Sequence, residues 1–156
     1  MDERETNLFM NLLTYGLNAV IDSLMGNTVL VARQLGSIVL DERGHLLLEA
    51  IGIPKITGTD INEIMSKLGD ALKSKEIVRV FDVIESNENG MKIKLGDCIL
   101  AHSAKMAKEA GAKIPLCPLL GVMMGIIKRN RDQDSVIDDY EHIPEENAEI
   151  FHIKLL

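Results

Sequence analysis

The residues of this chain that could bind a metal ion or act as nucleophiles gather around its two cysteines. Cys98 and His102 are four residues apart, so on a helix their side chains share one face and could bind one ion. Cys117 stands just before Pro118, at the start of the next apolar segment. Because unpaired N–H groups and the helix dipole favour a thiolate at a helix start, both cysteines are candidate metal ligands or nucleophiles.

A complete metal site needs further ligands, and His142 and His152 near the C-terminus are available. We predict a Zn(II) site formed by Cys98, His102, Cys117 and His152, because thiolate and imidazole groups suit this ion. The alternative is a pair of inert, buried thiols beside a solvated histidine, since buried free cysteine is common.

The elements that must position these residues begin with helices. Apolar residues at spacings of three and four predict amphipathic helices over residues 5–24, 28–43 and 61–74. Thr59 and Asp60 are expected to cap the third helix. Helical spacing returns over two later segments, residues 97–110 and 119–129.

The segments between and after these helices alternate apolar and polar residues, which predicts strands. The first hairpin joins residues 77–84 to 91–95 across an Asn-Gly turn, because Asn-Gly tolerates positive φ. The second joins residues 135–143 to 148–155. In its last strand, Phe151, Ile153 and Leu155 share one face, and Ile150, His152 and Lys154 share the other.

Two hairpins and several helices predict an α+β fold, with an antiparallel sheet of about four strands packed with helices. The length of 156 residues suits one domain, and no linker or internal repeat divides it. We therefore interpret residues 1–156 as a single domain. Residues 1–75 form its helical part, and residues 76–156 form a hairpin, two helices and a second hairpin.

Composition limits the possible partners. A net charge of −7 argues against nucleic-acid binding, which needs a basic surface. No apolar run approaches the roughly 20 residues needed to cross a bilayer. The two cysteines and the charged N-terminus, without a signal peptide, predict a cytoplasmic protein.

Methionine is abundant while aromatic residues are few, with 8 Met and 3% aromatics. Met lines adaptable apolar surfaces as readily as it fills gaps in a core. We expect Met106, Leu119, Met123 and Met124 to line a pocket for a hydrophobic ligand, and simple core packing is the alternative for each of them.

From Ile77 onward the sequence resembles the 4-vinyl-reductase-like, or hydrocarbon-binding, domain family. The resemblance lies in a strand that ends in Asp-Cys, Lys94–Cys98, and in the helix entry Ile114–Gly121, Ile-Pro-Leu-Cys-Pro-Leu-Leu-Gly. It implies a domain that holds a small hydrophobic molecule between sheet and helices, often as a dimer. The fold would be shared with Golgi-tethering-complex subunits and haem-based nitric-oxide sensors.

The resemblance also implies a zinc site, because Cys98 and Cys117 fall at two of the family's cysteine positions. The family typically has two more cysteines in the last hairpin, where this chain offers His142 and His152. No nicotinamide or flavin fingerprint accompanies the resemblance to a reductase.

Three functions follow as hypotheses. The leading one is a non-enzymatic module that binds or senses a hydrophobic ligand. The second is a metal- or thiol-dependent enzyme, such as a reductase, that uses Cys98, His102 and Cys117. The third is a homodimeric interaction domain, in which the helix predicted over residues 5–24 packs against its copy.

Overall fold

The structure is a computed structural model, which describes residues 10–14, 16, 17, 21, 31, 34, 46, 48–50, 52–111 and 117–156. Much of the helical part predicted over residues 1–75 therefore lies outside the described residues. Where residues 10–50 are described, every one of them is helical.

Helix α4, Ile61–Ser74, begins and ends where the sequence predicts. Asp60 is its N-cap, and the Asp60 carboxylate accepts a hydrogen bond of 2.9 Å from the N–H of Glu63. One face is buried and includes Ile64 and Leu68, as the spacing of three and four requires.

Strands β1, Val80–Asn87, and β2, Gly90–Gly96, form the first hairpin. The positive φ expected for its Asn-Gly turn is wrong, since the positive φ values among the described residues lie elsewhere. The Asn87 side chain holds the turn instead, accepting hydrogen bonds from the N–H groups of Asn89 and Gly90 at 2.8 and 3.1 Å. Gly90 is needed for close approach, because a Cβ there would lie 2.4 Å from the carbonyl oxygen of Ile153.

Helices α5, Ala101–Glu109, and α6, Pro118–Arg131, follow. The buried side chain of Asn11 holds the start of α5. It accepts a hydrogen bond of 2.8 Å from the N–H of Ser103 and donates one of 2.7 Å to the carbonyl of Ile99. A residue far away in the sequence thus satisfies backbone groups that α5 cannot satisfy itself.

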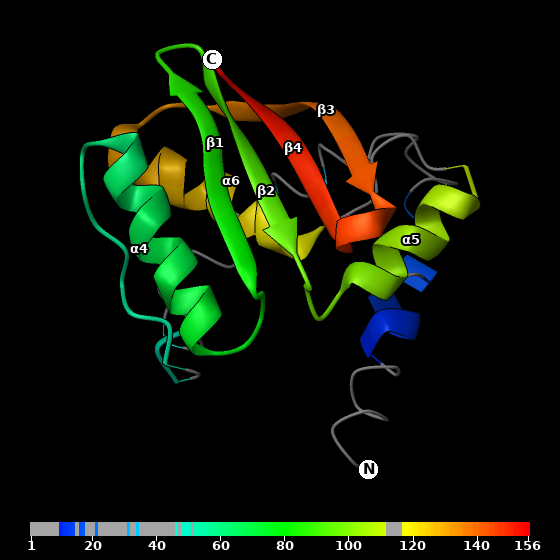
Figure 1. Ribbon diagram of the computed structural model, residues 1–156. Helices are drawn as coiled ribbons and strands as arrows, with labels where there is room; N and C mark the ends of the chain where they lie inside the picture. The colour runs from blue at the N-terminus through cyan, green and yellow to red at the C-terminus, as the bar shows by residue number, and fades with distance from the viewer. Residues whose placement is uncertain are drawn as a thin grey trace.

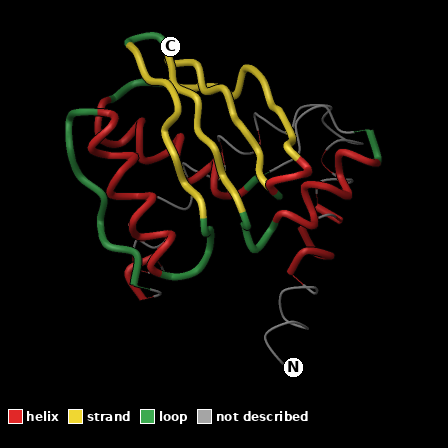
Figure 2. Tube along the Cα trace, in the orientation of Figure 1, coloured by secondary structure: helices red, strands yellow, loops and turns green. Residues whose placement is uncertain are grey.

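The second hairpin consists of β3, Ser135–Ile143, the short turn η1, Pro144–Glu146, and β4, Ala148–Leu155. Its last strand pairs with β2, so the four strands run in the order β1-β2-β4-β3 with every pair antiparallel. Figure 2 shows the strands side by side in one sheet. The predicted α+β class with a four-stranded antiparallel sheet is confirmed.

The core lies between one face of the sheet, the inner face, and helices α4 and α6, which Figure 1 shows on the same side of the strands. Ile93 and Ile153 from the sheet meet Leu68 from α4 and Met123 from α6 in one buried cluster. Among the described residues, no helix is long and apolar enough to cross a membrane.

Candidate functional site

An open cleft of about 590 Å³ lies between α5 and the connection of β3 to β4, which we call the α5 cleft. Figure 1 shows α5 beside η1 at this end of the sheet. The walls combine apolar side chains with polar and charged ones: Cys98, Ile99, Ala101, His102, Lys105, Lys108, Glu109, His142, Pro144 and Asn147. Two of the predicted metal ligands, Cys98 and His102, therefore face one cleft together with His142.

A bulge in β3 determines which of its side chains face inward. The pairing with β4 shifts between Ile137 and Asp139, so two residues of β3 stand opposite one of β4. The shift turns Tyr140 and His142 toward the inner face, which Ile137 also faces. Without the bulge, strict alternation would have turned Asp139 and Glu141 inward, whereas both are exposed.

His142 faces Glu149 directly across the β3–β4 pair. Their closest atoms are Nδ1 of His142 and a carboxylate oxygen of Glu149, 3.9 Å apart. This is the only ion-pair contact of Glu149 among the described residues, and its side chain is only 5% exposed. Because burial disfavours the charged form, it raises the pKa of Glu149 from 4.5 to about 7.

Tyr140 lies beside this pair and is also buried. Its ring packs against Phe151 with 5.1 Å between centroids, and the Nζ atom of Lys108 lies 4.8 Å from the ring centroid. Burial, together with the negative charge of Glu149, raises the pKa of Tyr140, so the phenol keeps its proton. Neither Tyr140 Oη nor His142 Nδ1, both buried, has a hydrogen-bond partner within the part of the chain that the structure describes.

The two thiols lie close enough to interact electrostatically, but they are not activated. Burial raises the pKa of Cys98 to about 11, and burial together with the charge of Cys98 raises the pKa of Cys117 to about 12. The thiolates expected at helix starts are therefore a wrong expectation. The helical placement of Cys98 is also wrong, because α5 begins at Ala101 with Leu100 as its N-cap, so Cys98 and His102 do not share a helical face. Cys117 is the N-cap of α6 as predicted, yet the loss of solvation outweighs the helix start. Both groups are protonated at neutral pH, which gives no support to a thiolate nucleophile.

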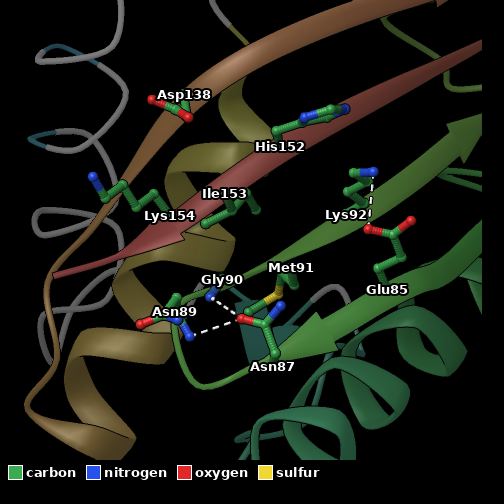
Figure 3. Close-up of a pocket in the computed structure, with 10 residues that line it drawn as sticks. All are labelled: Glu85, Asn87, Asn89, Gly90, Met91, Lys92, Asp138, His152, Ile153 and Lys154. Atoms are coloured by element: carbon green, nitrogen blue, oxygen red, sulfur yellow. Dashed lines mark hydrogen bonds and ion pairs between the residues drawn. The ribbon is translucent and has the colours of Figure 1, made fainter.

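The predicted zinc ligands are separated by the sheet. His152 lies on the face opposite to Phe151 and Ile153, whereas Cys117 is buried in the core on the inner face. Figure 3 shows His152 in a second cleft, on the outer face, with Asp138 and Lys154.

No group of three or more His, Cys, Asp or Glu residues that could hold a metal ion is present in the described ranges. The four predicted donors therefore do not converge on one point, and zinc binding by this chain stays a prediction.

The predicted ligand-lining residues are not among the residues that form the walls of the α5 cleft. Met123 and Met124 of α6 are buried in the core, and Met106 and Leu119 are half-buried. None of the four lines the α5 cleft or the outer-face cleft. Their role in ligand binding stays a prediction.

Sequence reasoning missed Tyr140 and Glu149 as site residues. A signal for Glu149 was present, because alternation in the last strand places it on the same face as Phe151 and Ile153. An acid at an inward-facing position of an apolar strand is unusual enough to mark a site. Tyr140 gave no such signal, because its inward direction depends on the bulge.

No family model matches the chain, and no curated protein matches it significantly. Among solved structures, the phenol-responsive sensory domain of the transcription activator PoxR, crystallised with phenol, matches with a TM-score of 0.50. The match has 13% sequence identity and covers 90% of this chain and 73% of that chain. At this identity, the comparison shows that the two domains share their fold.

Proposed function

We propose that this chain is a small-molecule-sensing domain that binds a hydrophobic ligand in the α5 cleft. The observation that carries the proposal is the cleft itself, which combines apolar wall residues with His142, whose buried Nδ1 atom lacks a hydrogen-bond partner among the described residues. Its volume of about 590 Å³ is in the range of small-molecule sites. The fold shared with a phenol-responsive sensory domain adds support.

Apolar burial would provide most of the affinity. Ile99, Ala101 and Pro144 supply apolar wall area, and each Å² removed from water contributes roughly 25 cal/mol before the costs of association. Membership of the 4-vinyl-reductase-like family, in which a hydrophobic ligand is expected, is part of the same proposal. Elemental analysis of freshly purified protein decides separately whether zinc accompanies the ligand.

The experiment uses the whole chain and two matched variants. Native mass spectrometry and solvent extraction look for a molecule retained from expression, and Nile red, a neutral apolar dye, reports on binding to the emptied protein. Ala101→Trp fills the cleft from its wall, while Ala110→Trp adds the same side chain at the exposed far end of α5.

We expect the wild type and Ala110→Trp to bind Nile red and Ala101→Trp to lose at least tenfold in affinity. The proposal is wrong if no molecule is retained and the dye does not bind. Equal dye binding by both variants would also exclude the α5 cleft as the site.

A homodimeric interaction domain is the second candidate function. Met10, Leu13 and Leu17 are spaced to share one helical face and are 47%, 47% and 59% exposed. Sedimentation of the wild type should show a dimer, and Leu13→Glu with Leu17→Glu should dissociate it. Leu156→Glu, at another exposed apolar position, is the matched control. A wild-type chain that sediments as a monomer excludes this candidate.

A further inference from the structure

We propose that Tyr140, His142 and Glu149 form the polar floor of the α5 cleft and recognise a hydroxyl group on an otherwise apolar, neutral ligand. The inference rests on the proposed function. It adds which chemical group the ligand carries and which side chains bind it.

Of the three side chains, His142 lines the cleft, and Glu149 and Tyr140 each lie next to a residue that lines it. Glu149 lies 3.9 Å from His142 on the neighbouring strand. Tyr140 lies under Lys108, a wall residue whose Nζ atom is 4.8 Å from the Tyr140 ring centroid. The floor is therefore built from β3 and β4, whereas α5 supplies half of the residues that line the cleft.

The hydrogen-bonding capacity of this floor is largely unused. Tyr140 Oη and His142 Nδ1 have no hydrogen-bond partner among the residues that the structure describes, although both atoms are buried. A buried polar group without a partner destabilises the fold, so a ligand that provides one gains binding energy. A hydroxyl group both donates and accepts. It can thus accept from the Tyr140 phenol and donate to the Glu149 carboxyl group or to a neutral His142 ring.

The charges around the floor favour a neutral group over an ion. A cation would have to pass Lys105 and Lys108 in the cleft walls before it reached Glu149. An anion would have to be buried against Glu149, whose side chain is itself only 5% exposed. A neutral hydroxyl group avoids both costs and still uses the donors and acceptors.

The test compares probes that differ only by a hydroxyl in place of a methyl group: phenol with toluene, and benzyl alcohol with ethylbenzene. Saturation-transfer NMR and displacement of Nile red measure their affinities for the whole chain. We expect the hydroxyl member of at least one pair to bind about tenfold more tightly in the wild type.

Variants then assign this preference to the floor. Tyr140→Phe and Glu149→Gln should each reduce the preference for the hydroxyl member by at least threefold while Nile red still binds. Glu141→Gln, an exposed neighbour on β3, should leave the preference unchanged. Since the readout is a ratio of two affinities, a general loss of stability does not imitate the effect.

The outcomes separate this inference from the proposed function. Equal binding of both members of each pair by the wild type overturns the hydroxyl site and leaves the small-molecule function intact. A preference that survives both floor variants overturns the assignment to these residues. Failure of every probe and of Nile red overturns the inference together with the proposed function.

Discussion

His142 Nδ1 and Glu149 Oε1 lie 3.9 Å apart across the β3–β4 pair, inside the domain and beside two protonated thiols. The contact is too long for a strong hydrogen bond. It therefore compensates little of the free energy that the Glu149 carboxylate loses when it is removed from water. Four measurable properties of the fold follow from this contact and from others that connect distant parts of the chain.

Glu149→Gln should change how stability depends on pH. Burial raises the pKa of Glu149 in the folded chain from 4.5 to about 7, so folding favours the protonated form. The stabilising contribution of Glu149 is therefore fully present below about pH 4.5, and about 3 kcal/mol of it is lost as the pH rises to about 7. Urea denaturation should show the variant gaining up to about this amount relative to the wild type between pH 5 and pH 8.

Glu141→Gln is the matched control for this prediction, because Glu141 is an exposed acid on β3. The free energy of unfolding of Glu141→Gln should change with pH as that of the wild type does, from pH 5 to pH 8. A constant difference between Glu149→Gln and the wild type across this pH range would contradict the burial of an ionisable Glu149.

Thiol reactivity should be low in the folded chain. With its pKa raised to about 11, Cys98 has about one hundredth of the thiolate of an ordinary cysteine near pH 8, and Cys117 has still less. Reaction with a chromogenic disulfide reagent should be at least about one hundredfold slower than after unfolding in urea. Cys98→Ser isolates Cys117, and rapid modification of the folded variant would show that the thiol is not buried.

Gly69→Ala should destabilise the fold although Ala is the better helix former. A Cβ at this position of α4 would lie 2.6 Å from Cδ1 of the Phe81 ring. The clash should exceed the helix preference of about 1 kcal/mol and leave a net loss of about 1–2 kcal/mol, measured by denaturation. Phe81→Leu should reduce the loss when the two changes are combined.

Ser66→Ala on the exposed face of α4 is the control for this prediction. Stabilisation by Gly69→Ala would contradict the close packing of α4 on β1.

Asn11→Ala should weaken the attachment of the N-terminal helical segment to α5. It removes the hydrogen bonds of Asn11 to Ser103 and Ile99 and leaves the buried N–H group of Ser103 without this partner. We expect a loss of about 2 kcal/mol in the free energy of unfolding and faster amide exchange of Ser103. Asn62→Ala, at an exposed position of α4, should have little effect. Unchanged exchange at Ser103 would contradict the contact.

The sequence alone determined the local elements of this protein. Helix α4 with its Asp60 cap, both hairpins, and Cys117 before α6 agree with prediction, because periodicity and caps depend on residues a few positions apart. The antiparallel pairing within each hairpin followed from the same local signals.

Only the tertiary structure decided what forms the site. Pairing of β2 with β4, and the bulge that turns Tyr140 and His142 inward, depend on contacts between segments far apart in the chain. The same packing places His152 on the outer face, away from Cys117. Burial also determined the protonation of Glu149 and of the thiols. Their pKa values depend on how much water the surrounding elements exclude, and the local spacing of residues does not encode this degree of burial.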